Sequence, residues 1–167
     1  MKLYYIKDEY INFLKTIDDK VPDNKKETRP YVGIVLDICG FKYYAPLSSP
    51  KIKHINMKNT TDFHKINSGK YGAINLNNMI PVIETELILI DINNISDIKY
   101  RRLLQNQYKY IKSDSKNITN KANKLHKIIF TEDPYLTPYD LAVKSRCCDL
   151  QKLENEIHKY IKSQAKN

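Results

Sequence analysis

The apolar residues of the first 29 positions follow two different periods. Residues 2–6 (Lys-Leu-Tyr-Tyr-Ile) are rich in β-forming side chains and predict a short strand. Asp8 is a good N-cap for a helix over residues 9–17, because the apolar positions that follow it recur at helical spacing. Residues 18–29 are polar and contain Pro22, which predicts a loop of about a dozen residues. The chain therefore begins as strand, helix and long loop.

A β-hairpin is the clearest signal in the middle of the chain. Residues 31–38 form a mostly apolar run and residues 41–47 a second one, joined by Cys39-Gly40, where glycine supplies a positive φ. Residues 55–70 are polar and predict a long loop with room for a short helical turn. Further strands are predicted over residues 71–76 and 86–90, which gives a small antiparallel sheet.

The C-terminal part is helical in pattern. Ser96-Asp97 can cap a helix that extends to about residue 112, and residues 113–115 interrupt or restart it before a second apolar stripe that ends at Phe130. A helical turn at 139–143 and an amphipathic helix over 148–161 complete the pattern. We predict one α+β domain over residues 1–167, with a sheet-rich core (1–95) and a basic helical part (96–167). The sheet is expected to be small and strongly bent, or partly closed into a barrel.

The charge adds a functional clue. The net charge is +9, and residues 41–80 carry six Lys against Asp62 alone, while residues 99–127 carry nine Lys or Arg against Asp114 alone. The chain also has 13 Tyr and no Trp. An A/T-biased genome accounts for such a composition but not for two separate basic blocks, which favour a nucleic-acid partner. No apolar run approaches the roughly 20 residues of a membrane span, no signal peptide is visible, and three cysteines suggest no disulfide scaffold, so we expect a cytoplasmic protein without a membrane partner.

Residues 45–54 hold the most concentrated chemistry. Pro46 and Pro50 bracket two serines and disfavour helix. Two hydroxyls, two ammonium groups and an imidazole follow within seven residues, contributed by Ser48, Ser49, Lys51, Lys53 and His54. Such a turn can hold a phosphodiester; the alternative is an ordinary solvated turn, since serine and proline are common there.

Other chemistries find little support. The four histidines are scattered and no HExxH motif, Walker glycine loop or GxSxG elbow is present, so we expect no metal and no cofactor. RNA suits the remaining inventory, because its 2′-OH can attack the adjacent phosphate without a nucleophile from the protein. The protein then needs to position the strand, move protons and stabilise the phosphorane charge.

Several of these stretches together resemble the ToxN/AbiQ family of endoribonuclease toxins, which belong to type III toxin–antitoxin systems. The main likeness lies in Gly-Ile-Val-Leu at 33–36, in Tyr-Ala-Pro-Leu-Ser-Ser-Pro-Lys at 44–51, and in His54. It extends in order to residues 1–10, 18–22, 72–76, 79–81 and 100–104 and covers roughly residues 1–130.

The resemblance implies a fold similar to the MazF/Kid toxins with added helices, and metal-independent, sequence-preferring cleavage that leaves a 2′,3′-cyclic phosphate and a 5′-OH. It implies that Tyr10, Ser48, Ser49 and Lys51 are catalytic, with Ser49 and Lys51 as proton-transfer partner and phosphorane stabiliser. Arg29 matches a basic residue of the family. Since arginine stays protonated, Arg29 is expected only to clamp a phosphate.

The resemblance also implies RNA partners. The target is mRNA, and the antitoxin is an RNA of pseudoknot repeats that the toxin cuts from its precursor and that inhibits it in a ring-like assembly, with three toxins and three RNAs as one candidate stoichiometry. The expected roles are growth arrest and abortive infection of phages. The residues expected to bind RNA are Arg29, Lys53, His54, Lys99, Arg101, Arg102, Lys109 and Lys112.

Two other interpretations stay open at this point. A non-catalytic RNA- or DNA-binding module would need only the basic blocks and the tyrosines. A generic α+β scaffold with a lysine-rich surface would bind no RNA tightly.

Overall fold

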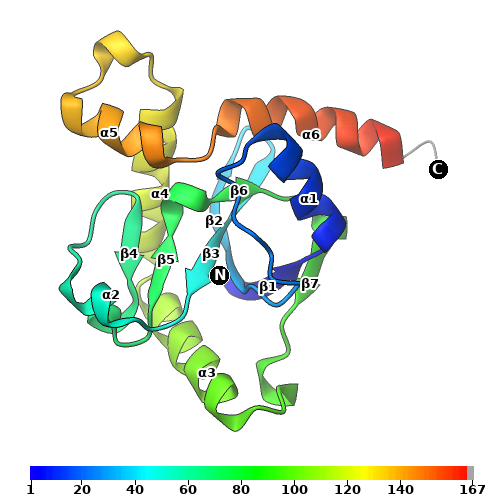
Figure 1. The fold of residues 1–167 in the computed structure, drawn as a ribbon, viewed down its shortest axis with the longest axis vertical. Coiled ribbons are helices and arrows are strands. Elements are labelled where there is room, and N and C mark those ends of the chain that lie inside the picture. Colours follow the sequence, from blue (N-terminus) through cyan, green and yellow to red (C-terminus); the bar gives the residue numbers. More distant parts are fainter. Residues whose placement is uncertain (165–167) are drawn as a thin grey trace.

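An antiparallel sheet of seven strands forms the centre of the molecule (Figure 1). The computed structural model describes residues 1–164, with side chains up to residue 161. The strands are β1 (Lys2–Ile6), β2 (Tyr31–Ile38), β3 (Phe41–Ser48), β4 (Phe63–Lys65), β5 (Ala73–Asn75), β6 (Ile80–Pro81) and β7 (Leu87–Leu89). Their order is β4-β5-β3-β2-β1-β7, with β6 paired to β3. The predicted antiparallel sheet is confirmed. The two ends of the strand order, β4 and β7, do not pair with each other, so the alternative of a barrel is wrong.

The predicted hairpin is the longest pairing in the sheet. Strands β2 and β3 pair from Tyr31↔Pro46 to Ile38↔Phe41, with a register shift between Gly33 and Leu36. Cys39 and Gly40 both have positive φ, as a two-residue turn of this kind requires. The apolar side chains of β3 are buried as far as Leu47, and the strand ends at Ser48, where burial ends.

Within residues 1–164, six α-helices surround the sheet (Figure 1). They are α1 (Asp8–Ile17), α2 (Ile52–Asn56), α3 (Ile98–Ser113), α4 (Ser115–Phe130), α5 (Pro138–Arg146) and α6 (Leu150–Gln164). Helix α4 packs on β2, and α1 packs on α6, whose buried positions follow the predicted periodicity. The two-part helical segment around Asp114 and the capping of α3 by Asp97 are confirmed. None of the helices within residues 1–164 is both long and apolar enough to cross a bilayer.

Two local predictions are wrong. Asp8 does not cap α1, because its carboxylate accepts hydrogen bonds from Asn24 Nδ2 (2.7 Å) and from the backbone of Glu27 (3.1 Å), which holds the 18–30 loop against the helix. Residues 55–70 are not one loop, because β4 lies within them and pairs with β5. Three residues are too few for a visible alternation of apolar and polar side chains, so this strand is formed by tertiary pairing.

A half-buried acid, Glu154, lies where β3, α4 and α6 meet. The Tyr43 hydroxyl donates a hydrogen bond to Glu154 Oε1, and His126 Nε2 lies 3.9 Å from the same oxygen. The His126 ring stacks on Phe130, with 4.2 Å between ring centroids. Burial raises the pKa of Glu154 to about 7 and lowers the pKa of His126. The packing of α6 is therefore coupled to a proton on Glu154.

We expect Glu154→Gln to flatten the pH dependence of stability. The folded protein keeps the Glu154 proton up to a pKa of about 7, while the unfolded chain releases it near 4.5. The free energy of unfolding therefore falls as pH rises from 4.5 to 7, by up to about 3 kcal/mol. Glutamine cannot ionise, so the variant should lack this decline. His126, whose pKa is lowered by burial, contributes the opposite slope below its ordinary pKa.

Urea unfolding at pH 5 and pH 8 measures the difference. Glu156→Gln, on the same helix but paired with Lys159 at the surface, is the control. An equal decline in wild type and Glu154→Gln would show that Glu154 does not carry the effect.

Candidate functional site

The segment Ser48-Ser49-Pro50-Lys51 links the end of β3 to α2. Ser48 is half-buried, whereas Ser49 and Lys51 are exposed. Asn75 Nδ2 donates a hydrogen bond to Ser48 Oγ at 2.6 Å, and the strand pairing sets Ser48 opposite Ala73. The hydroxyl of Ser48 is thus held by β5, while the next hydroxyl and the ammonium group face solvent.

Gly72 lies directly against the backbone of the same turn. Its φ is +91°, and a Cβ at this position would lie 1.9 Å from the Ser48 carbonyl oxygen. Such a distance is far inside van der Waals contact, and the φ value is one that glycine tolerates best. The path of the backbone at Ser48 and Ser49 therefore depends on the missing side chain of Gly72.

The turn borders an open cleft of about 480 Å³, which we call the Ser49 cleft. The residues that line it are Tyr5, Lys25, Thr28, Arg29, Pro30, Leu47, Ser48, Ser49, Lys51 and Tyr100. Four of the predicted site residues, Ser48, Ser49, Lys51 and Arg29, therefore meet in one cleft. The cleft therefore combines three cationic side chains with the hydroxyl groups of serine, threonine and tyrosine residues. Such a concave site suits a phosphodiester.

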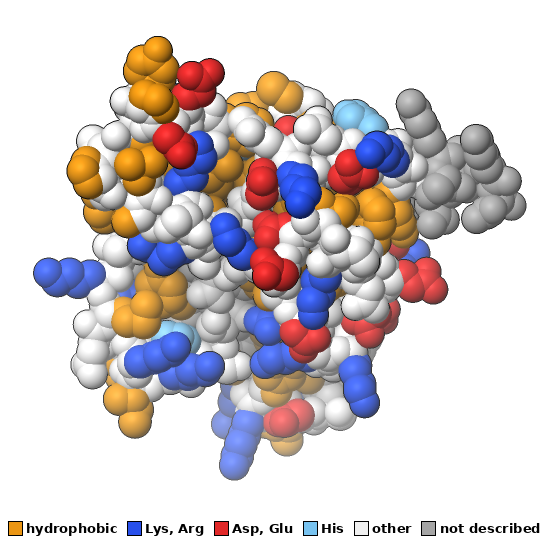
Figure 2. All heavy atoms as spheres, turned by 45° about the horizontal axis from the view of Figure 1, so that its top comes forward, with side chains coloured by type: hydrophobic (Ala, Val, Ile, Leu, Met, Phe, Trp, Pro, Cys, Tyr) orange, Lys and Arg blue, Asp and Glu red, His pale blue; other side chains and the backbone are white. Residues whose placement is uncertain are grey.

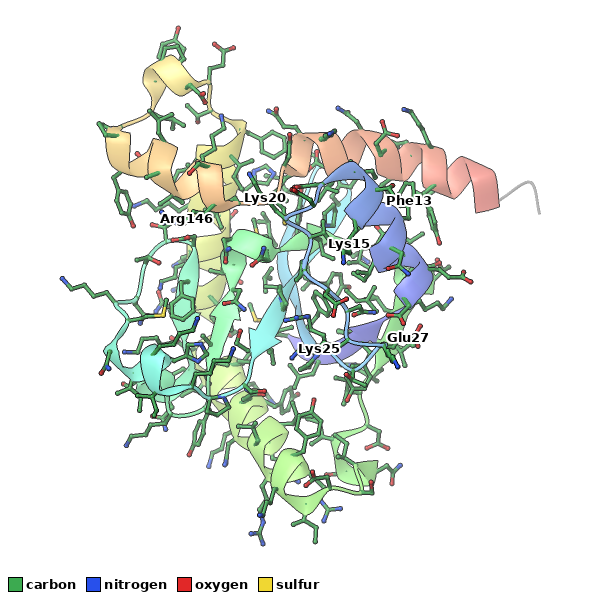
Figure 3. All side chains as sticks on the ribbon, in the orientation of Figure 1. Phe13, Lys15, Lys20, Lys25, Glu27 and Arg146 are labelled. Atoms are coloured by element: carbon green, nitrogen blue, oxygen red, sulfur yellow. The ribbon has the colours of Figure 1, made fainter. Side chains whose placement is uncertain are left out.

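The loop over residues 18–30 brings Arg29 to the cleft. Leu47 donates its backbone N–H to the Pro30 carbonyl at 2.8 Å, so the end of the loop is anchored beside β3. Asn24 is buried and donates to the Ile6 carbonyl at 2.7 Å. Arg29 is half-buried, with Nε donating to the Asp23 carbonyl at 2.5 Å. Figure 3 shows Lys25 on the same loop, pointing toward the end of β3.

The structure does not place Tyr10 in this cleft. Its side chain is fully buried, its hydroxyl donates to the Pro81 carbonyl at 2.9 Å, and its ring packs on Phe13 and Tyr160. Burial raises the pKa of Tyr10, so the phenol stays protonated. The catalytic role that the resemblance implies for Tyr10 therefore finds no support in this geometry, because the helical stripe that carries Tyr10 faces the core beside α6.

Two other tyrosines take part in the cleft instead. Tyr5 and Tyr100 both line it. The pKa of Tyr100 is raised mainly by burial and to a smaller extent by the neighbouring Tyr5 phenol. Neutral phenols donate hydrogen bonds and do not act as bases at neutral pH. Tyr100 stood on a predicted helix face and Tyr5 on a predicted strand, but nothing in either pattern indicated that they meet.

A second cavity of about 500 Å³ lies on the other side of the turn, and we call it the Arg146 cavity. It shares Ser48 and Lys51 with the Ser49 cleft and is also lined by Lys53, His54, Met57, Lys58, Thr60, Asp62, Phe63, Asn75, Asn77, Asn78 and Arg146. Arg146 Nε and Nη2 donate to the two carboxylate oxygens of Asp62 at 3.0 and 3.2 Å. Lys53 is exposed and His54 is buried. Sequence reasoning missed Asp62 and Arg146, which lie 84 positions apart with no shared motif.

The predicted basic residues of α3 lie outside both cavities. Lys99, Arg102, Lys109 and Lys112 are exposed, but Arg101 is half-buried, and its Nη1 donates to the carbonyls of residues 93 and 95 at 3.3 Å. Arg101 therefore holds the segment that precedes α3 against this helix. Figure 2 shows several Lys and Arg side chains at the lower left of one face, where no acidic side chain is visible, while acidic and basic side chains mix over its centre and right. Among the residues that the structure describes, no three His, Cys, Asp or Glu side chains gather as metal ligands.

The chain matches known proteins over nearly its whole length. The family model for the toxin ToxN of type III toxin–antitoxin systems matches residues 2–158. The chain is 39% identical to endoribonuclease ToxN of Pectobacterium atrosepticum over 77% of this chain and 81% of that one. It is 36% identical to endoribonuclease ToxN of Bacillus thuringiensis subsp. kurstaki (95% and 84%), and 31% identical to endoribonuclease AbiQ of Lactococcus lactis subsp. lactis (97% and 90%).

Solved structures agree. A toxin structure concerned with selective inhibition by a non-coding RNA pseudoknot superposes with a TM-score of 0.84 at 35% identity, covering 95% of this chain and 96% of the other. The structure of AbiQ, described as a lactococcal anti-phage endoribonuclease, gives a TM-score of 0.77 at 27% identity, with 96% and 98% covered. The match includes the sheet and the C-terminal helices. This chain belongs to the ToxN family of type III toxin–antitoxin toxins.

Proposed function

We propose that this chain is a metal-independent, sequence-preferring endoribonuclease whose active site is the Ser49 cleft. The observation that carries the proposal is the meeting of Ser48, Ser49, Lys51 and Arg29 in one open cleft, although Arg29 comes from a different part of the chain. The family relatives named endoribonucleases support the same activity.

The proposed reaction is an attack within the RNA strand. The 2′-oxygen forms a bond to the adjacent phosphorus and loses its proton, while the bond from phosphorus to the 5′-oxygen breaks and that oxygen gains a proton. The products are a 2′,3′-cyclic phosphate and a 5′-OH, so no water or oxidant is consumed. The protein has to position the strand and stabilise the charge on the phosphorane.

Each cleft residue has a role that its position allows. Lys51 is exposed and stabilises the non-bridging oxygens, and Ser49 exchanges a proton with the reacting oxygens. Ser48 orients the phosphate, because its oxygen accepts from Asn75 and leaves its own proton free to donate. Arg29 clamps the phosphate. Tyr5 and Tyr100 replace Tyr10 as the phenols that donate to substrate oxygens.

We further propose an RNA antitoxin of pseudoknot repeats as the partner, which the toxin cuts from its precursor and which inhibits it in a ring-like complex of three toxins and three RNAs. A relative of known structure is inhibited by such a pseudoknot, and AbiQ is an anti-phage enzyme, which supports roles in growth arrest and abortive infection. The exposed Lys99, Arg102, Lys109, Lys112 and Lys53 would contact RNA phosphates. Cleavage of mRNA implies a cytoplasmic location, and a likeness of the sheet to the MazF/Kid toxins stays a prediction.

Cleavage in the presence of EDTA tests the proposal. Wild-type protein is expected to cut RNA, but not DNA of the same sequence, at an unchanged rate in excess EDTA, and to leave cyclic phosphate ends that resist alkaline phosphatase. A protein whose cleavage stops with the chelator would contradict the mechanism. Tight RNA binding without any cleavage would instead favour a non-catalytic nucleic-acid-binding module.

A further inference from the structure

The Arg146 cavity continues the Ser49 cleft across the catalytic turn. Both are lined by Ser48 and Lys51, and Asn75, which holds the Ser48 hydroxyl at 2.6 Å, faces the Arg146 cavity. An RNA strand with its scissile phosphate over the turn therefore places the adjoining nucleotide at the mouth of this cavity. The cavity volume of about 500 Å³ lies in the range of small-molecule sites.

The interior offers hydrogen-bond acceptors. The amide nitrogens of Asn75 and Asn78 are engaged by Ser48 Oγ and by the Lys20 carbonyl (2.9 Å), and that of Asn77 lies 3.5 Å from the Arg146 carbonyl. Within the described part of the chain, no group donates to the three side-chain carbonyl oxygens. Each is therefore available to a ligand.

A buried histidine points to the same conclusion. The His54 side chain is 3% exposed, lines the cavity, and its Nδ1 has no hydrogen-bond partner among the described residues. Burial and the neighbouring Lys53 and Lys51 lower the pKa of His54, so the ring is neutral at physiological pH. An unpaired buried nitrogen is costly, and a rotation of the ring that turns it to a ligand in the cavity would recover that cost. The Phe63 ring, 5.8 Å from the His54 ring, adds an apolar wall.

The charged side chains divide the cavity into a neutral interior, which suits a base, and a cationic rim, which suits phosphates. Arg146, labelled in Figure 3 on α5, is neutralised by the buried carboxylate of Asp62. The free cations Lys51, Lys53 and Lys58 are exposed and lie at the rim. A neutral interior with aromatic and amide groups suits the edge of a nucleobase, whereas the rim suits the backbone phosphates.

We propose that the Arg146 cavity binds the nucleobase next to the scissile phosphate and sets the sequence preference of cleavage at that position. The inference rests on the proposed ribonuclease function and adds the binding site that this function leaves unassigned. Asn77 and His54 read the edge of the base, and the Asp62–Arg146 pair holds α5 as the cavity wall.

The test compares cleavage sites in a randomised RNA pool for wild type, Asn77→Ala and His54→Asn. The base preference at one position beside the cut is expected to fall about tenfold in each variant, since a base-edge contact discriminates by about this factor. Preferences at all other positions should persist. Asn117→Ala, in a separate exposed site, is the control and should keep the wild-type profile. If Asn77→Ala does not fold, as judged by thermal unfolding, Asn77→Asp keeps the size of the side chain.

Failure of the base site and failure of the proposed ribonuclease function give different results. If wild type cuts RNA and the variants show the wild-type preference at every position, the cavity does not read a base, while the proposed function stands. If wild type cuts no RNA, the same pool is selected for binding. Loss of one base from the selected motif in Asn77→Ala then supports the base site, and an unchanged motif overturns it.

Discussion

Ser49→Ala and Lys51→Ala are each expected to lower the rate of RNA cleavage by about 10²–10³, with little change in RNA affinity. Both side chains are exposed at the turn that we propose to be catalytic, and removal of one transition-state hydrogen-bond donor in other enzymes has effects of this size. The affinity should persist because many phosphate contacts on the basic surface remain. Single-turnover cleavage and filter binding on the same RNA separate the two effects.

Matched substitutions elsewhere control for general loss of charge or hydroxyl. Ser96→Ala and Lys152→Ala both change exposed side chains that line neither the Ser49 cleft nor the Arg146 cavity. These variants should cut RNA at the wild-type rate. Cleavage by folded Ser49→Ala or Lys51→Ala within threefold of wild type (about half a kcal/mol) would remove that residue from the chemistry.

Gly72→Ala is expected to lower cleavage by about 10²-fold although residue 72 carries no reacting group. The new methyl group would lie 1.9 Å from the Ser48 carbonyl oxygen, so the turn has to shift. A displacement of about 1 Å in a catalytic group commonly has this effect. The substitution also introduces strain at a φ of +91°, which lowers stability by roughly 1–3 kcal/mol.

Gly40→Ala separates strain from displacement. Gly40 has a φ of +82°, close to that of Gly72, but nothing lies within 4 Å of a Cβ built there. Gly40→Ala should therefore lose only the stability that the strained φ accounts for, Gly72→Ala should lose more in urea unfolding because of the added clash, and only Gly72→Ala should lose cleavage. Equal cleavage by the two variants would mean that the turn does not depend on Gly72.

Local patterns predicted most of the fold. The β2–β3 hairpin, the two-part helix around Asp114 and the amphipathic α6 each carry a long periodic signal, and each is present. Strand β4 has three residues, and its existence depends on pairing with β5, which no local pattern contains. Local patterns also could not predict whether the sheet closes into a barrel, because closure depends on whether the end strands β4 and β7 come together.

Local patterns indicated the site only where its residues are close in sequence, whereas Arg29, which also lines the cleft, was expected only from the family resemblance. Ser48, Ser49 and Lys51 share one turn, and their chemistry was visible in the sequence. Tyr10 shows the limit: its helical stripe was correct, but that stripe packs on α6, and the phenol donates to Pro81 of β6 instead of reaching the cleft. Tyr5 and Tyr100 meet only through the fold.

Distant residues were missed for the same reason. The pair of Asp62 and Arg146 spans 84 positions and joins a loop to α5. Neither residue stands in a motif, and the sequence around residue 146 carries only a weak helical pattern. Such pairs become visible when the chain is folded.

The most direct test of the mechanism is cleavage of an RNA with one 2′-deoxy nucleotide on the 5′ side of the scissile phosphate. If the substrate supplies the nucleophile to a site made of Ser48, Ser49, Lys51 and Arg29, this single change abolishes cleavage there while binding persists. The same change one nucleotide away should have little effect. Cleavage at the deoxy position at the normal rate would mean that water or a protein group attacks the phosphorus, which would contradict the account.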